Sequence, residues 1–172
     1  MNITKEANLA AKWILDKKVI AYPTEGVWGI GGLNIPENIN AISLVKNRSK
    51  EKKYILLFHS FQQLVDHFEI KKKYYPLIKN NENTFTTMLI PTNQNKIAVR
   101  IPGDKNLLYF LKLVNKPILS TSANLSGENT CRDIKEIKTI FDGKIFGVYD
   151  APLGDEKKPS KILDLVNNEY IR

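Results

Sequence analysis

The feature that most constrains this chain is an apolar run that ends abruptly in small polar residues. Pro-Ile-Leu at positions 117–119 leads directly into residues 120–127, which hold four hydroxyls, one amide and a glycine. A buried strand that ends in this way can present backbone N–H groups and hydroxyls to an anionic ligand. Ser and Asn also favour ordinary turns and helix N-caps. This stretch alone therefore leaves a binding loop and a simple turn both open.

The apolar periodicity predicts that helices alternate with strands early in the chain and that strands cluster later. Thr4, Pro36, Ser60 and Asp133 stand where helices are expected to begin. No repeat or linker divides the chain, so we expect one domain over residues 1–172. The predicted fold class is α/β, with a twisted, open, mixed β-sheet flanked by helices and a ligand site beyond the strand ends. The expected helices cover 4–16, 36–45, a segment from 60, 74–78, 106–114 and 133–141, and the expected strands cover 19–22, 54–58, 86–90, 96–101, 118–120, 145–149, 161–165 and 169–171.

Composition excludes several classes of protein. The chain has 172 residues, and no apolar run approaches the length of a membrane span. Its N-terminus lacks the layout of a signal peptide. Cys131 is the only cysteine, which excludes an intrachain disulfide and a four-cysteine zinc site. His59 and His67 have no acidic or cysteine companions at ligand spacing, so no protein-held transition metal is indicated. A cytoplasmic location is expected.

The net charge of +8 has two interpretations. It indicates either a protein that binds a polyanion or a lysine-rich, solvated surface. Most of the positive charge is lysine, and arginines are few. Arg48 and Arg100 are therefore the more informative cations, because a guanidinium is a fixed fork for phosphate or carboxylate.

Two further segments could contribute to an anion site. The strand expected at 19–22 leads into Pro23-Thr24-Glu25-Gly26 and then Gly29, Gly31 and Gly32, but this segment lacks the spacing of a phosphate loop or a dinucleotide fingerprint. Taken alone, the segment is better explained as a glycine-rich connection lying close to a neighbouring strand. Lys46 and Arg48 follow the helix that begins at Pro36, where they could complement the helix dipole or clamp a phosphate.

Arg100 lies inside a predicted strand. Alternation places it on the same face as Ala98, within an apolar run. A cation on a half-buried strand needs an anionic partner. A ligand carboxylate, Glu25 and Asp104 are the three candidates, and the sequence does not decide between them.

In order and spacing, these pieces resemble the YrdC-domain family of threonylcarbamoyl-AMP synthases, in its short, single-domain bacterial form. The resemblance covers nearly the whole chain and implies a basic concave cavity on the sheet. The matching motifs are Tyr22-Pro23-Thr24-Glu25, Lys46-Asn47-Arg48, Ala98-Val99-Arg100, the stretch 120–127, and Pro159-Ser160-Lys161-Ile162-Leu163-Asp164.

The resemblance implies a reaction and its partners. The protein would be a nucleotidyltransferase. It would convert L-threonine, bicarbonate or CO2, and ATP into threonylcarbamoyl-adenylate and pyrophosphate. Mg²⁺ would be held mainly by the ATP phosphates. Other proteins would then transfer the threonylcarbamoyl group to tRNA. Weak binding of RNA by this chain on the same basic surface is a further expectation. The protein would contribute positioning and electrostatics and no covalent nucleophile.

The resemblance also implies roles for individual residues. Lys46 and Arg48 correspond to the catalytic cations that hold the ATP phosphates. Thr24, Arg100 and Ser120 correspond to positions that bind threonine, with Arg100 suited to its carboxylate. The remaining ATP contacts implied by the family pattern are Thr87, Ser122, Asn124 and Ser160.

This sequence departs from the family pattern at several positions. Ser49 stands where proline is common after the Lys-x-Arg motif, and residues 83–86 replace most of a Pro-Gly-Pro-x-Thr stretch. Leu57 stands where longer relatives have histidine, and His59 lies two positions on. These changes bear on the shape of the ATP pocket.

Two alternatives remain. The first is a non-catalytic protein that binds RNA in RNA or ribosome maturation. The second is a YrdC-type module that makes a different carbamoyl-adenylate, although such modules normally belong to longer chains with zinc-binding cysteines.

Overall fold

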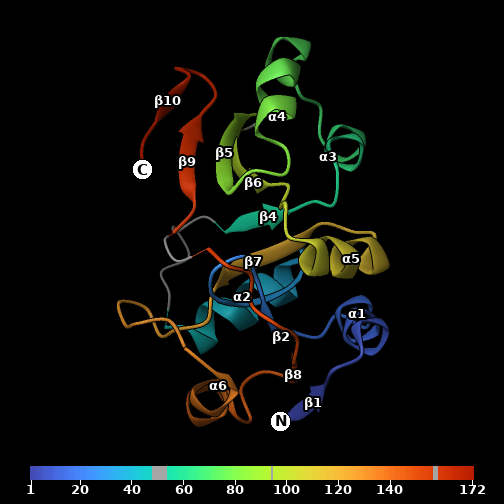
Figure 1. Cartoon of the computed structure of the whole chain (residues 1–172), viewed down its shortest axis with the longest axis vertical. Coiled ribbons are helices and arrows are strands. Elements are labelled where there is room, and N and C mark those ends of the chain that lie inside the picture. The colour runs from blue at the N-terminus through green and yellow to red at the C-terminus, as the bar shows by residue number, and fades with distance from the viewer. Residues whose placement is uncertain (48–53, 94, 157–158) are drawn as a thin grey trace.

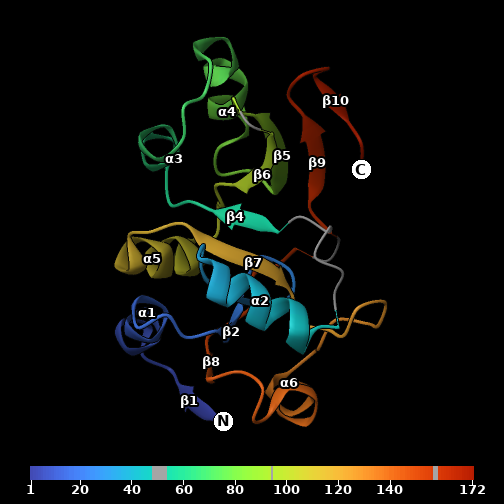
Figure 2. The same cartoon turned by 180° about the vertical axis from the view of Figure 1, so that it is seen from behind.

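The computed structural model describes residues 1–47, 54–93, 95–156 and 159–172. Its strands are β1 (Asn2–Thr4), β2 (Ile20–Pro23), β3 (Trp28–Leu33), β4 (Ile55–Leu57), β5 (Thr86–Pro91), β6 (Lys96–Arg100), β7 (Ile118–Ser122), β8 (Gly147–Tyr149), β9 (Lys161–Asp164) and β10 (Glu169–Tyr170). Within the described residues these form one ten-stranded sheet in the order β1-β8-β2-β3-β7-β4-β6-β5-β9-β10. The sheet is mixed: β1–β8, β2–β8, β4–β6 and β5–β9 pair in parallel, and the other neighbours are antiparallel. Figures 1 and 2 show its strong twist from β7 to the nearly upright β9.

Helices pack on both faces of the sheet, as the sequence predicted. They are α1 (Ala7–Leu15), α2 (Pro36–Val45), α3 (Phe61–His67), the short 3₁₀ helix η1 (Lys72–Tyr74), α4 (Tyr75–Asn81), α5 (Lys105–Val114) and α6 (Ile134–Phe141). One core joins α2, α3, α4 and α6 to one face of the sheet, and a second core joins α1 and α5 to the other. Among the described residues, no helix combines the length and the apolar character needed to cross a membrane.

Helix starts follow the capping signals closely. Ser60 accepts a hydrogen bond from the Gln63 backbone N–H at 3.2 Å, and Asp133 caps α6 in the same way. The predicted cap at Thr4 is wrong. Thr4 ends strand β1, and its hydroxyl accepts from the Glu6 N–H at 3.0 Å, so α1 begins only at Ala7. A short edge strand of three residues leaves too little alternation in the sequence to be recognised.

The glycine-rich segment after Tyr22 is a central strand. We expected a loop there, but β3 is buried along its whole length and pairs with both β2 and β7. A Cβ at Gly31 would lie 2.0 Å from the Leu119 carbonyl oxygen and 2.7 Å from the Tyr22 hydroxyl. The Tyr22 ring therefore lies against β3, where only glycine leaves enough space.

The cavity lies on the face of the sheet that α1 and α5 cover only in part. Leu57 on β4 belongs to the core under α1 and α5, and Ile55 on the same strand points to the same face. Ile55 lines a cavity together with residues of β5, β6 and β9. The helices α1 and α5 thus cover one part of this face, and the cavity occupies the part that they leave open.

Replacing Gly31 by alanine tests the packing of Tyr22 on β3. We expect Gly31→Ala to lower the free energy of unfolding by at least about 3 kcal/mol, because its methyl group meets a backbone carbonyl that cannot move away. Gly29→Ala is the matched control. Its nearest neighbour is the Thr24 methyl at 3.0 Å, so a loss of about 1 kcal/mol is expected. Urea denaturation measures both, and equal losses would contradict this account.

Candidate functional site

The cavity has a volume of about 490 Å³, and its lining combines hydroxyl and arginine side chains with apolar residues such as Ile55, Phe85 and Ile162. Ligand pockets commonly have volumes in this range. Arg100 and Arg172 contribute positive charge, and no Asp or Glu of the described residues lines it. The sequence analysis predicted six of the lining residues as site residues: Thr24, Thr87, Arg100, Ser120, Ser122 and Ser160.

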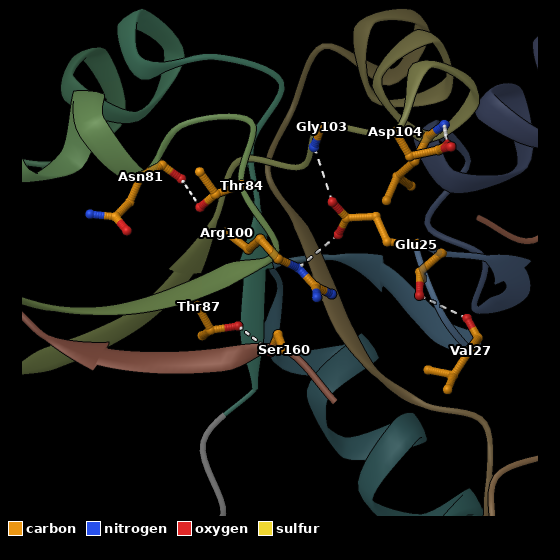
Figure 3. Close-up of polar contacts among 11 residues, drawn as sticks. Glu25, Val27, Asn81, Thr84, Thr87, Arg100, Gly103, Asp104 and Ser160 are labelled. Carbon is orange, nitrogen blue, oxygen red and sulfur yellow. Dashed lines mark hydrogen bonds and ion pairs between the residues drawn. The ribbon is translucent and has the colours of Figure 1, made fainter. Parts of the chain in front are cut away.

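Arg100 forms a buried ion pair with Glu25. Its Nε lies 3.4 Å from Glu25 Oε2, and the two side chains are only 7% and 6% exposed (Figure 3). Glu25 Oε1 accepts a second contact, a hydrogen bond of 3.0 Å from the Gly103 N–H. Of the partners that the sequence left open, Asp104 instead caps α5 by accepting from the Leu107 N–H at 2.8 Å. The protein partner of Arg100 is therefore Glu25.

Burial sets the electrostatics of this pair. It raises the pKa of the Glu25 carboxyl, while the charge of Arg100 and the Gly103 N–H oppose that rise. Burial also lowers the pKa of the Arg100 guanidinium, and the charge of Glu25 opposes that fall. Each partner offsets part of the desolvation cost of the other. Arg100 stays protonated, since the ordinary arginine pKa is far above neutrality.

Neutral polar groups also lie near Arg100, among them the buried Tyr22 and the cavity residues Thr24 and Ser120. Burial raises the pKa of Tyr22 to about 12, although a hydrogen bond with Ser120 and the charge of Arg100 oppose this rise. Thr24 donates its hydroxyl to the Val27 carbonyl at 2.7 Å, which closes the turn between β2 and β3. This turn brings Thr24 to the same cavity as Ser120.

Thr87 and Ser160 meet on the opposite side of the cavity. Their hydroxyls lie 3.0 Å apart, and both residues are buried (Figure 3). Parallel pairing of β5 with β9 brings these positions together across 73 residues of sequence. The structure thus brings together two residues that the family resemblance had assigned to ATP.

Lys46 is buried against the loop that follows β7. Its Nζ donates to the Ser122 carbonyl, to the Asn124 carbonyl at 2.6 Å and to Asn124 Oδ1 at 3.0 Å. Asn124 Oδ1 also accepts from the Ser122 hydroxyl at 2.6 Å. Only 1% of Lys46 is exposed. The structure therefore brings Lys46, Ser122 and Asn124 together, with the ammonium group donating to protein acceptors.

The other residues named in the sequence analysis lie away from the cavity or outside the described residues. Arg48 and Ser49 lie outside the described residues. Leu57 is a core residue, and His59 Nε2 lies 3.1 Å from Asn115 Oδ1 away from the cavity. Among the described residues, no group of three His, Cys, Asp or Glu side chains could hold a metal ion.

Phe85 and Arg172 are two lining residues that contact predicted site residues and that the sequence analysis did not select as site residues. Phe85 lies 5.2 Å from the Arg100 guanidinium carbon, in cation–π contact. Arg172 lines the cavity and donates its Nε–H to the Ser160 carbonyl at 3.2 Å. The scarcity of arginine, which drew attention to Arg48 and Arg100, would also have identified Arg172.

Comparison with known proteins gives the family. A family model for Sua5, YciO and YrdC proteins, described as "Telomere recombination", matches residues 12–172. The chain belongs to the Sua5/YciO/YrdC family. This confirms the family resemblance found in the sequence, and the mixed sheet flanked by helices is the fold of its solved members.

Curated members of this family cover almost the whole chain. The threonylcarbamoyl-AMP synthase of Wigglesworthia glossinidia brevipalpis is 33% identical over 177 residues, which span 91% of this chain and 88% of that protein. The threonylcarbamoyl-AMP synthase of Buchnera aphidicola subsp. Baizongia pistaciae is 34% identical over 170 residues, which span 90% of each.

Solved structures of P. abyssi Sua5 have the same fold. A Sua5 variant superposes with a TM-score of 0.83 at 27% identity, over 95% of this chain and 56% of that one. P. abyssi Sua5 complexed with L-threonine gives 0.82 at 26% identity, over 93% and 51%. This chain therefore spans about half the length of these Sua5 chains.

Removing the Lys46 side chain tests its role in holding the loop after β7. Lys46→Ala leaves buried carbonyl and amide oxygens without their donor, so we expect a loss of about 2–4 kcal/mol in the free energy of unfolding. Lys138→Ala, at an exposed position on α6, should change it by no more than about 0.5 kcal/mol. A Lys46→Ala protein as stable as the wild type in chemical denaturation would refute a structural role for this ammonium group.

Proposed function

We propose that this chain is a threonylcarbamoyl-AMP synthase, a nucleotidyltransferase that acts on L-threonine, bicarbonate or CO2, and ATP. The observation that carries the proposal is a buried arginine in a hydroxyl-lined cavity that has no carboxylate among its described lining residues. Such a cavity suits ligands with carboxylate and phosphate groups. Membership of a family that includes two named synthases at 33% and 34% identity supports the reaction.

In this proposal different residues of the cavity and of the adjoining loop after β7 bind the two substrates. Arg100 binds the carboxylate of threonine, with Thr24 and Ser120 contacting the rest of the amino acid. Thr87, Ser122, Asn124 and Ser160 contact ATP, and Lys46 and Arg48 act on its phosphates. For Lys46 this requires that at least one of its hydrogen bonds to the loop after β7 be exchanged for a phosphate oxygen.

The chemistry needs positioning more than a protein nucleophile. The threonine amine attacks CO2, which forms a C–N bond and releases a proton to give a carbamate. A carbamate oxygen then attacks the α-phosphorus of ATP, and the bond to the β-phosphate breaks to release pyrophosphate. Fixed hydroxyls, amides and cations align the two reactants and stabilise the charge that develops on the phosphates.

Mg²⁺ enters this scheme with the nucleotide. Hydroxyls line the cavity, and the lining residues that the structure describes include no carboxylate that could bind the ion directly. We therefore propose that the ATP phosphates hold Mg²⁺, which would supply neutralisation of phosphate charge. The unstable adenylate would pass to proteins that transfer its threonylcarbamoyl group to tRNA.

Release of pyrophosphate tests the proposal directly. Purified protein with ATP, Mg²⁺ and bicarbonate should release pyrophosphate when threonine is added, and much less with serine or with no amino acid. Equal release in all three mixtures would contradict the synthase. The net charge of +8 favours binding of RNA as the second candidate function, and a protein that binds RNA without this release would support it.

Replacing Arg100 tests the threonine side of the cavity. We expect Arg100→Ala to lower threonine-dependent pyrophosphate release at least about 100-fold, because the substrate carboxylate loses its charged partner and Glu25 stays buried without one. Arg132→Ala, at an exposed arginine beside α6, is the matched control and should retain wild-type activity. Weak RNA binding should be nearly the same in both variants. Unchanged activity of Arg100→Ala would rule out this assignment.

A further inference from the structure

The contact between Arg100 and Glu25 is incomplete for a buried ion pair. Their facing atoms, Nε and Oε2, lie 3.4 Å apart, and neither has a hydrogen-bond partner among the described residues. Such a pair contributes little to stability, because desolvation of both charges offsets their attraction. Buried polar atoms without hydrogen bonds in a folded protein require another explanation. The adjoining cavity offers one, since Arg100 lines it.

Arg100 lies between Glu25 and the cavity. Figure 3 shows Nε as the guanidinium nitrogen that meets Glu25, with the terminal nitrogens beyond it. Glu25 itself does not line the 490 Å³ cavity but faces a smaller hollow of about 360 Å³. The Phe85 ring packs near the guanidinium group, with 5.2 Å between the ring centre and Cζ. Two neighbours thus restrict the orientation of the planar group.

Backbone groups of two segments fix the position of Glu25. Gly103, just before α5, donates its N–H to Oε1 at 3.0 Å. The Gly154 N–H donates to the Thr24 carbonyl at 3.0 Å, and the Glu156 N–H donates to the Glu25 carbonyl at 2.9 Å. A Cβ at Gly154 would lie 2.5 Å from the Glu25 carbonyl oxygen, so this segment packs tightly on the residue. Glu25 is therefore a rigid support.

We propose that Glu25 is a positioning residue for threonine binding: it holds the Nε side of Arg100, so that the terminal nitrogens are presented to the threonine carboxylate. This inference rests on the synthase function proposed above. A guanidinium can bind a carboxylate through two parallel N–H groups only when its plane and direction are fixed. Glu25 supplies that direction without contacting the substrate.

The direction in which threonine binding changes when Glu25 is replaced distinguishes two roles. Glu25 either orients Arg100 or only neutralises its charge. If Glu25 only weakened the positive charge of Arg100, its removal would strengthen the binding of an anion. If Glu25 orients Arg100, its removal would weaken binding. In the Glu25→Gln variant, the amide oxygen of the new side chain can still accept from Gly103, which turns its N–H groups toward Nε of Arg100. Two donors then face each other, and the guanidinium loses its support.

Steady-state kinetics of Glu25→Gln test the proposal. We expect the KM for threonine to rise about 10- to 100-fold. This is the effect of losing one charged hydrogen bond between Arg100 and the threonine carboxylate. The KM for ATP should stay near the wild-type value, because Glu25 does not line the cavity. The melting temperature should fall in this variant, since the buried guanidinium loses its counter-charge, so the comparison of the two KM values tests the positioning role. Glu156→Gln is the matched control. It removes an exposed carboxylate in the neighbouring segment, whose contact with Glu25 runs through the backbone.

Each result has a definite meaning. An unchanged or lower KM for threonine in Glu25→Gln would overturn the proposal, as would an equal rise in Glu156→Gln. Parallel changes in both KM values would indicate a purely structural role and would also overturn it. A wild-type protein without threonine-dependent release would contradict the synthase itself. Calorimetric binding of threonine without ATP to both proteins would then decide the role of Glu25, and absence of binding to the wild type would reject it.

Discussion

A buried lysine organises the end of the central strand β7. Lys46 ends helix α2, and its ammonium group donates to both Ser122 and Asn124 while its carbonyl accepts from the Ser126 N–H at 2.9 Å. The side chain and the backbone carbonyl of Lys46 thus both hydrogen-bond to the hydroxyl-rich loop and hold it in place. The cost of burying the charge is offset by three short, charge-assisted hydrogen bonds. Without this clamp, the backbone carbonyls of the loop would need other partners or water.

A second buried cation, Arg100, follows the same principle at the cavity. Arg100 is buried on β6 and has Glu25 as its anion, and Glu25 is in turn tied to backbone N–H groups. In both places a buried charge joins segments that are distant in sequence. The two arrangements differ in one respect that matters for function. Lys46 is fully hydrogen-bonded to protein, whereas the Arg100 pair is left incomplete at the edge of the cavity.

The sequence predicted the parts of this arrangement that depend on local patterns. Alternation placed Arg100 on the correct face, capping signals located α3 and α6, and the exit of β7 was recognised from its hydroxyls. It missed β3, because glycine usually indicates a loop. In this strand Gly29 and Gly31 instead leave space for the Tyr22 ring, and Gly32 leaves space for Asn38. The burial of Lys46 and the contact of Thr87 with Ser160 depend on strand pairing over long separations, which no local pattern encodes.

The segment that departs most from the family pattern still contributes to the site through different atoms. Residues 83–86 lack the prolines expected there, yet Asn83 adopts a left-handed conformation with φ 59° and donates its N–H to the Ile101 carbonyl at 3.0 Å. Asparagine tolerates this conformation better than most residues. The turn places Phe85 against Arg100 and the Asn83 carbonyl against Gly103, the residue that binds Glu25. The same segment therefore supports Arg100 twice, once through a ring and once through the backbone that holds its counter-ion.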